Sequence, residues 1–270
     1  MATSTPSTDL PRTRPLTELP EQADPFSTER TVRTGDVDTG KRLRLDGIAR
    51  YLQDIGTDNL AAVGASETDP LWIVRRTIVD VHRPAEYGRT LRLRRWCDAL
   101  STRWANVRVR FDDPGDAPDG PLIETAAFWI DIGPTTGAPT RISDGLFEHM
   151  ARYAHDTRLK WTAWLPARAP DEVDDERVFP LRATDLDPFG HVNNAVYWHG
   201  LEELLSLRPD VPDSPYRAVI EHLRPVAAGE TLTLRTTLRE DGLTVWFTVE
   251  DHTRAVAWIG RKPDALRWTP

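Results

Sequence analysis

Apolar positions along this chain follow a helical period first and a strand-like alternation afterwards. Residues Leu45, Ile48, Leu52, Ile55 and Val63 recur at near-helical spacing after a turn, which predicts one apolar helix. A short strand candidate that begins at Phe26 precedes this helix. Four strand-like stretches follow it, separated by turns rich in Pro, Gly and Asp, over residues 72–82, 90–99, 104–111 and 122–132. The first half is therefore predicted to run strand, helix, four strands.

The second half repeats this order. A strand over 177–182 and a turn lead into an apolar helix over 192–205, and further strands are predicted over 216–226, 231–239, 243–250 and 254–260. The triplets DVD at 36–38 and DLD at 185–187 match at a separation of 185 − 36 = 149 residues, and Tyr51 matches Tyr197 at 197 − 51 = 146. A long helix crossed by a curved antiparallel sheet is the hot-dog arrangement, and two copies can pack as an internal dimer. We predict an α+β fold, a tandem double hot-dog in which two antiparallel sheets each wrap around one long helix.

Four segments are expected along the chain. Residues 1–25 are rich in Pro, Ser and Thr without an apolar period, which predicts a disordered N-terminal tail whose role the sequence leaves open. Residues 26–144 form the N-terminal hot-dog repeat, and residues 145–175 form a polar, partly helical linker. Residues 176–270 form the C-terminal repeat, which carries the candidate catalytic motif.

Composition narrows the classes of function. The net charge of −8 and the pI near 5.4 argue against a general nucleic-acid binder. No apolar run is long enough for a membrane span, and a single cysteine, Cys97, fits a reducing, cytoplasmic compartment. Seven arginines between positions 89 and 110 would give an acidic partner a basic face, although strands with one solvated face carry such charges anyway.

The segment DLDPFGHVNN, residues 185–194, places chemical groups at a predicted helix N-terminus. The carboxylate of Asp187 could add to an acyl carbonyl or activate a water for the attack, as acyl-transfer chemistry requires. The backbone amides of Gly190 and His191 are candidates for stabilising an oxyanion, while the side chains of His191 and Asn193 could orient the reacting groups. Each residue also has an ordinary alternative as a turn, cap or core residue. For Glu202 and Glu203, nearer the other end of this helix, a solvated or interdomain role is expected.

Metal ligands and nucleotide motifs are not evident in the sequence. Asp187, His191 and His199 do not fall into an HxxxH or HExxH pattern with an added carboxylate. A Gly-rich phosphate loop is also missing. We therefore expect neither a metal nor a cofactor.

Several short motifs carry a family resemblance: IARYLQD at 48–54, LWIVRR at 71–76, and the DLD triplet followed by HVNN. With these motifs the chain resembles the plant and bacterial acyl-acyl carrier protein thioesterases over about residues 26–262. The resemblance implies catalytic positions at Asp187 and His191. The chain departs from the family at Phe189, where an asparagine is usual, and at Pro225 and Val226, where a Glu-Cys pair is usual. In this respect it is similar to simpler hot-dog thioesterases that depend on one carboxylate and helix-terminal amides.

This resemblance implies hydrolysis of fatty acyl-acyl carrier protein to free fatty acid and carrier protein, in fatty acid biosynthesis. Acyl-CoA is the alternative substrate, and a catalytically silent acyl-binding protein and a hydratase are rival classes. One active site per chain is expected, because Asp38 is not followed by a histidine or an asparagine pair. The chain is expected to be a monomer or a homodimer. Apolar residues of the first repeat could line an acyl tunnel, namely Trp72, Ile73, Val74, Phe128 and Trp129.

Overall fold

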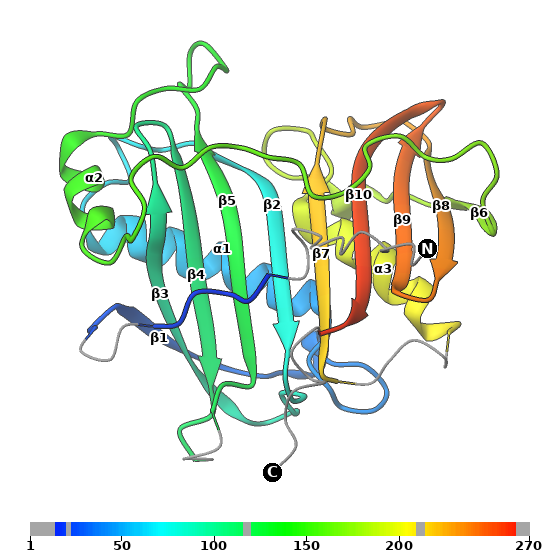
Figure 1. Ribbon diagram of the computed structural model, residues 1–270, viewed down its shortest axis with the longest axis horizontal. Helices are drawn as coiled ribbons and strands as arrows, with labels where there is room; N and C mark the ends of the chain where they lie inside the picture. The colour runs from blue at the N-terminus through cyan, green and yellow to red at the C-terminus, as the bar shows by residue number, and fades with distance from the viewer. Residues whose placement is uncertain (1–13, 20–22, 116–119, 209–213, 263–270) are drawn as a thin grey trace, which may run out of the picture.

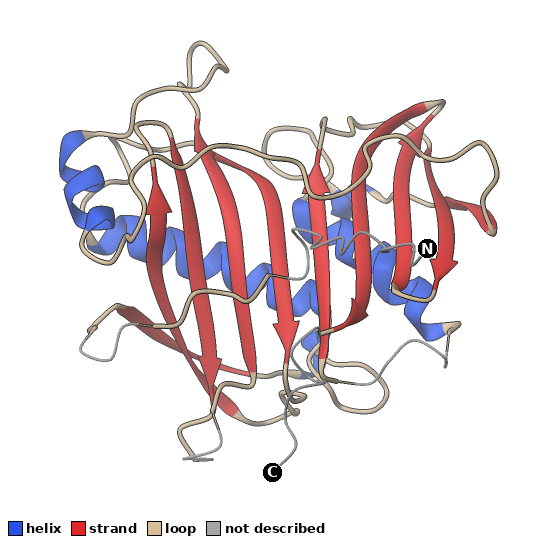
Figure 2. Ribbon diagram, in the orientation of Figure 1, coloured by secondary structure: helices blue, strands red, loops and turns tan. Residues whose placement is uncertain are grey.

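One curved antiparallel sheet of ten strands, with two long helices against one of its faces, forms the body of the molecule (Figures 1 and 2). The computed structural model describes residues 14–19, 23–115, 120–208 and 214–262. The N-terminal repeat contains β1 (Phe26–Thr31), α1 (Leu45–Ala62), β2 (Trp72–Val81), β3 (Thr90–Leu100), β4 (Trp104–Asp112) and β5 (Ile123–Asp131). The C-terminal repeat contains β6 (Asp175–Phe179), α3 (Asn194–Ser206), β7 (Tyr216–His222), β8 (Leu232–Arg239), β9 (Gly242–Val249) and β10 (His252–Arg261).

The two repeats share a single sheet. Its strand order is β1-β3-β4-β5-β2-β7-β10-β9-β8-β6, so five strands of each repeat meet at the antiparallel pair β2 and β7. The two predicted sheets are thus joined edge to edge, which removes the unpaired inner edge that each would otherwise present. The α+β tandem hot-dog architecture is confirmed.

Both long helices bury their apolar residues against this sheet. In α1, Leu45, Ile48 and Ile55 have no exposed surface, in agreement with the predicted helical period. In α3, Leu201 is fully buried and Trp198 is 1% exposed. The two helices also contact each other, so the central core is continuous across both repeats.

Two buried ion pairs cross the seam between β2 and β7. Arg76 lies opposite Glu221 and donates to its Oε1 at 3.0 Å. Asp80 lies opposite Arg217 and accepts two hydrogen bonds, at 2.6 and 2.7 Å. Because all four side chains are buried, these charges depend on each other for compensation.

The predicted linker covers part of the molecule. It contains all but the first residue of α2 (Asp144–Ala151), which is capped by the Ser143 side chain and packs near β3. The following chain crosses the face of the sheet opposite the long helices (Figure 1). There the rings of Trp161 and Trp164 lie 5.0 and 3.9 Å from the Arg76 guanidinium. Glu221 accepts one hydrogen bond each from the backbone amides of Trp164 and Leu165. This segment therefore packs against the seam between the repeats.

Part of the expected N-terminal tail lies on the same face of the sheet. Within residues 14–19, the carbonyl of Arg14 accepts a hydrogen bond from Arg217 and that of Thr17 accepts one from Arg108. Leu16 packs beside the tryptophans of this face. Residues 14–19 thus differ from the expectation of a tail without structure, because they supply carbonyl groups to two buried arginines. Residues 1–13 and 20–22 of the expected tail lie outside the described residues.

Candidate active site

The turn before α3 wraps the backbone around the carboxylate of Asp187. The Oδ1 atom accepts hydrogen bonds from the amides of Phe189, at 2.9 Å, and His191, at 3.1 Å. Gly190 has a φ of +76°, a conformation that glycine adopts without steric cost, and its amide donates to the Asp187 carbonyl at 3.0 Å. The Oδ2 atom makes no hydrogen bond to any residue that the structure describes. One oxygen is thus anchored and the other is available.

A cavity of about 730 Å³ lies beside this turn. Asp187, His191 and Asn193 line it from the C-terminal repeat, so three of the four predicted site residues meet there. The N-terminal repeat contributes four of the five predicted tunnel residues, which are Trp72, Ile73, Val74 and Trp129. The fifth, Phe128, stacks edge-on against Trp161 on the opposite face, because successive side chains of a strand alternate between faces.

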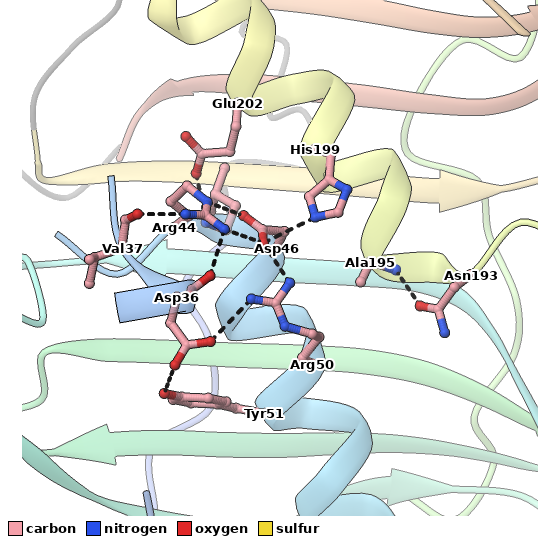
Figure 3. Close-up of polar contacts among 12 residues, drawn as sticks. Asp36, Val37, Arg44, Asp46, Arg50, Tyr51, Asn193, Ala195, His199 and Glu202 are labelled. Carbon is pink, nitrogen blue, oxygen red and sulfur yellow. Dashed lines mark hydrogen bonds and ion pairs between the residues drawn. The ribbon is translucent and has the colours of Figure 1, made fainter. Parts of the chain in front are cut away.

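Asn193 is held by contacts from both repeats. It is the N-cap of α3, and its Oδ1 atom accepts from the Ala195 amide at 2.9 Å (Figure 3). The same oxygen accepts a hydrogen bond of 3.0 Å from Nε2 of Gln53 on α1. Its amide nitrogen has no partner among the described residues and remains able to donate into the cavity.

The two amides expected to stabilise an oxyanion are engaged within the turn, and another amide beside the cavity is free. The Gly190 and His191 amides both donate within the turn, so neither is free for a substrate oxygen, and this part of the prediction is wrong. Asn194, the first residue of α3, lines the cavity, and its N–H donates to no described residue. Since the positive end of the helix dipole lies there, this N–H is suited to a developing oxyanion.

Two histidines face the cavity. The His191 imidazole has no hydrogen bond to a described residue. His222, at the end of β7, packs edge-on against Tyr197 with the ring centroids 4.9 Å apart, and its buried Nε2 atom lacks a partner within the described part of the chain. Burial, together with the charge of Arg75, lowers the pKa of His222 to about 4, so this imidazole is neutral at pH 7. No pattern in the sequence selects His222, which reaches the cavity only through the fold.

The corresponding turn in the first repeat is closed. Asp38 accepts from the backbone amide of Arg42 at 2.9 Å and from its guanidinium at 3.0 Å, so both carboxylate oxygens are engaged. The N–H of Leu45, the first residue of α1, donates to Glu202 of α3 at 2.6 Å. Glu202 therefore has the interdomain role expected of it, and it occupies the amide that corresponds to the free one in the second repeat.

These correspondences fix the register between the repeats. Asp38 and Asp187 are 149 residues apart. The same separation holds for Lys41 and Gly190, which both have a positive φ, and for the first residues of α1 and α3. At this separation Tyr51 corresponds to Gly200, and the matching of Tyr51 with Tyr197 is wrong. Tyr51 instead donates to Asp36 at 2.8 Å (Figure 3).

A charged network connects the two long helices beside the closed turn (Figure 3). Its centre is the buried Asp46 of α1, which accepts from Arg44, Arg50 and, on α3, His199. Burial alone would raise the pKa of Asp46, but hydrogen bonds from His199, Arg44 and Arg50 hold it well below its ordinary value. This network fixes α1 and α3 relative to each other, and hence the two sides of the cavity.

The arginine-rich segment does not form one basic face. Arg94 and Arg110 both donate to Asp112, and Arg108 is buried in the sheet. Arg95 points from β3 into the cavity region. Near the cavity the other cationic side chains are Arg75 and Arg224. Strand alternation divides the arginines between the two faces of the sheet.

The residues that the structure describes contain no cluster of three or more His, Cys, Asp or Glu side chains placed to hold a metal ion. In the same residues, none of the helices is both long and apolar enough to cross a membrane.

Comparisons with solved structures define the class of fold. The putative oleoyl thioesterase from Lactobacillus plantarum is similar with a TM-score of 0.72 and 19% identity, covering 88% of this chain and 96% of the other. The 12:0-ACP thioesterase from Umbellularia californica is similar with a TM-score of 0.69 and 18% identity, covering 87% of this chain and 96% of the other. An acyl-ACP thioesterase from Bacteroides thetaiotaomicron is similar with a TM-score of 0.71 and 12% identity, covering 87% of this chain and 96% of the other. The fold is thus that of the tandem hot-dog proteins.

Sequence comparisons identify the family. The family models for the N-terminal and C-terminal domains of acyl-ACP thioesterase match residues 23–150 and 168–259. This chain belongs to the acyl-ACP thioesterase family, a family of thioester hydrolases. The proteins MT2057 and Rv2001 of Mycobacterium tuberculosis, both described as uncharacterized, are each 42% identical to it over 246 residues, covering 91% of this chain and 96% of theirs.

Proposed function

We propose that this chain hydrolyses a fatty acyl thioester carried on acyl carrier protein and releases the free fatty acid and the carrier protein. The observation that supports this most is the contrast between the repeats. In the second repeat a carboxylate oxygen of Asp187 and the N–H of Asn194 are both unoccupied beside the cavity, whereas Asp38 and Leu45 are engaged by Arg42 and Glu202. One chain thus has one site for the reaction.

The proposed reaction uses four groups of the site. Oδ2 of Asp187 either attacks the thioester carbonyl, giving an acyl anhydride that water then hydrolyses, or removes a proton from the attacking water. In both routes the C–S bond breaks and the thiolate leaves with the carrier. The Asn194 N–H stabilises the negative charge on the carbonyl oxygen, and His191 and the Asn193 amide orient the carbonyl and the water.

The choice of acyl carrier rests on the positive charges beside the cavity and on the family to which the chain belongs. Arg75 and the exposed Arg224 line the cavity, where they could bind either the phosphate of a phosphopantetheine arm or an acidic protein surface. Acyl carrier protein is favoured by the family to which the chain belongs. Acyl-CoA is the alternative, because its phosphates present the same chemistry. Fatty acid biosynthesis in the cytoplasm is the proposed setting.

The test compares carriers with the same acyl group. We expect purified chain to release free thiol from lauroyl and palmitoyl carrier protein faster than from the matching CoA esters, with kcat/KM for the carrier protein falling as salt is raised from 50 to 500 mM. Arg224→Glu should lower kcat/KM for the carrier protein, and Arg168→Glu, exposed on the other face of the sheet, should leave it unchanged. Faster hydrolysis of CoA esters would select the alternative carrier.

The same assay addresses the silent acyl-binding protein. The cavity offers no second carboxylate at Pro225 or Val226, so all chemistry rests on Asp187. If no thioester is hydrolysed while acyl groups still bind, the proposal fails and the binding protein is the better description.

A further inference from the structure

Arg95 places a positive charge in the apolar part of the cavity. Leu91 and Leu93 of β3 are fully buried, and Arg95 follows them on the same face of the strand, toward α1. It lines the same cavity as Asp187 and donates from Nη1 to the Asn59 side chain of α1. The same cavity wall contains the apolar residues Leu60, Val107 and Met150.

No described acidic side chain forms an ion pair with Arg95. The neighbouring Arg94 is paired with Asp112, and the buried Arg108 approaches Glu124 at 3.5 Å. Burial lowers the pKa of Arg95 to about 10, which still leaves the guanidinium charged at pH 7. Among the described residues, its hydrogen-bond acceptor is the uncharged side-chain oxygen of Asn59.

Asn59 adds a second donor without an acceptor. The residue is only 5% exposed, and its Nδ2 atom is buried without a hydrogen-bond partner in the described residues. The oxygen of the same side chain is already used by Arg95. Arg95 and Asn59 together therefore offer N–H donors and no remaining acceptor, which is the complement of an anion.

An unpaired charge in the cavity wall and an unpaired buried amide beside it cost free energy that leucine or methionine would not. We propose that Arg95 binds a carboxylate at the far end of the acyl group, so that the preferred substrate is an ω-carboxyacyl thioester. Asn59 lies six residues beyond Gln53, the partner of Asn193, which is about 9 Å along α1. This axial distance suits an acyl chain of medium length. The inference rests on the proposed function, whose site it extends.

The test compares octanoyl and suberoyl thioesters, which have eight carbons each and differ in the terminal carboxylate. Wild-type chain should favour the suberoyl ester by roughly ten- to hundredfold in kcat/KM. Arg95→Met should reverse this preference, Arg95→Lys should retain part of it, and Arg94→Met, which loses the pair with Asp112, should leave it unchanged. Preference of the wild-type chain for octanoyl, or an unchanged ratio in Arg95→Met, would overturn the assignment.

A binding measurement separates this inference from the proposed hydrolysis. By calorimetry, octanoate should bind wild-type chain and Arg94→Met more tightly than Arg95→Met, whereas 1-octanol should bind all three equally. Carboxylate binding that depends on Arg95 without any hydrolysis would leave this inference standing and refute the proposed function. Hydrolysis without dependence on Arg95 in either assay would do the reverse. Thermal unfolding of each variant confirms that it is folded.

Discussion

At the residue scale, the two related aspartates differ because of the residue four positions after each. Arg42 engages one oxygen of Asp38 with its backbone amide and the other with its guanidinium. His191 supplies only its backbone amide to Asp187, so one oxygen stays available. A single exchange of side chain type thus separates a structural turn from a candidate catalytic one.

Glu202 closes the first repeat, and its removal has a predictable cost. Glu202→Ala should lower the free energy of unfolding by about 1–3 kcal/mol, because the Leu45 N–H would lose its charged acceptor. Glu202→Gln should cost less, since the amide oxygen can still accept. Urea unfolding checks this, with the exposed neighbour Glu203→Ala as the control. Equal effects of Glu202→Ala and Glu203→Ala would show that the contact contributes nothing.

Asp131 gives the stability a pH dependence. Burial and the neighbouring Asp69 carboxylate raise its pKa to about 6, and both Asp131 oxygens are buried without hydrogen bonds from described residues. Between about pH 4 and pH 6 the unfolded chain releases this proton while the folded chain keeps it, so stability from this residue falls as pH rises. Asp131→Asn should therefore raise Tm at pH 8. The fall of Tm as the pH rises above about 4 should also be smaller in this variant than in the wild type.

The control for this measurement is Asp251→Asn, in an exposed turn. A Tm at pH 8 that is no higher in Asp131→Asn than in wild-type chain would contradict the raised pKa.

The candidate site was predictable from sequence only where its groups are local. The motif placed Asp187, Gly190, His191 and Asn193 in one turn, and three of them line the cavity. It did not predict which amides the turn itself uses, because that depends on backbone geometry. Gln53, His222 and Arg95 reach the same cavity from other elements, and no local pattern marks them.

At the element scale, the period of the apolar residues predicted both long helices, but not where α3 begins. The predicted helix over 192–205 in fact starts at Asn194, because Asn193 caps it and Val192 still pairs with Leu186 in extended conformation. This difference of two residues in the start of the helix matters, because the free amide of the first helical residue is the proposed oxyanion donor. The exact start of a helix is thus part of the site.

The contact between α1 and Asn193 gives a prediction at this scale. Gln53→Ala should lower kcat several-fold with little change in Tm, because Asn193 would keep its cap to Ala195 but lose its hydrogen bond from the other repeat. The matched control is Thr57→Ala, one turn further along α1 and also lining the cavity. Equal kinetics of Gln53→Ala and wild-type chain would assign Gln53 to packing alone.

At the scale of the whole molecule, the repeat in the sequence predicted two hot-dog units. It did not predict that the units join into one sheet through the β2–β7 seam. The residues that cross it, such as Asp80 and Arg217, are 137 positions apart, and a single sequence has no sign that they are opposite each other. The same holds for the segment with Trp161 and Trp164, which covers the seam although its composition resembles a linker.

The seam should control the stability of both repeats together. Arg217→Met should destabilise the chain by about 3–5 kcal/mol, because Asp80 would stay buried without its partner. The double variant Asp80→Leu with Arg217→Met should recover much of this loss. Chemical unfolding measures both, and a single transition is expected since one sheet and one core span the repeats. A double variant less stable than both single variants would refute this account.

The central claim, one hydrolytic site per chain at the second turn, is tested most directly by one pair of matched variants. Asp187→Asn and Asp38→Asn alter equivalent positions, and kcat/KM for an acyl thioester is measured for both. In Asp187→Asn, kcat/KM should fall by roughly a hundredfold or more, because the carboxylate acts in the reaction. Asp38→Asn should stay near the wild-type value. Hydrolysis that survives in Asp187→Asn, or is lost equally in both variants, would contradict the claim.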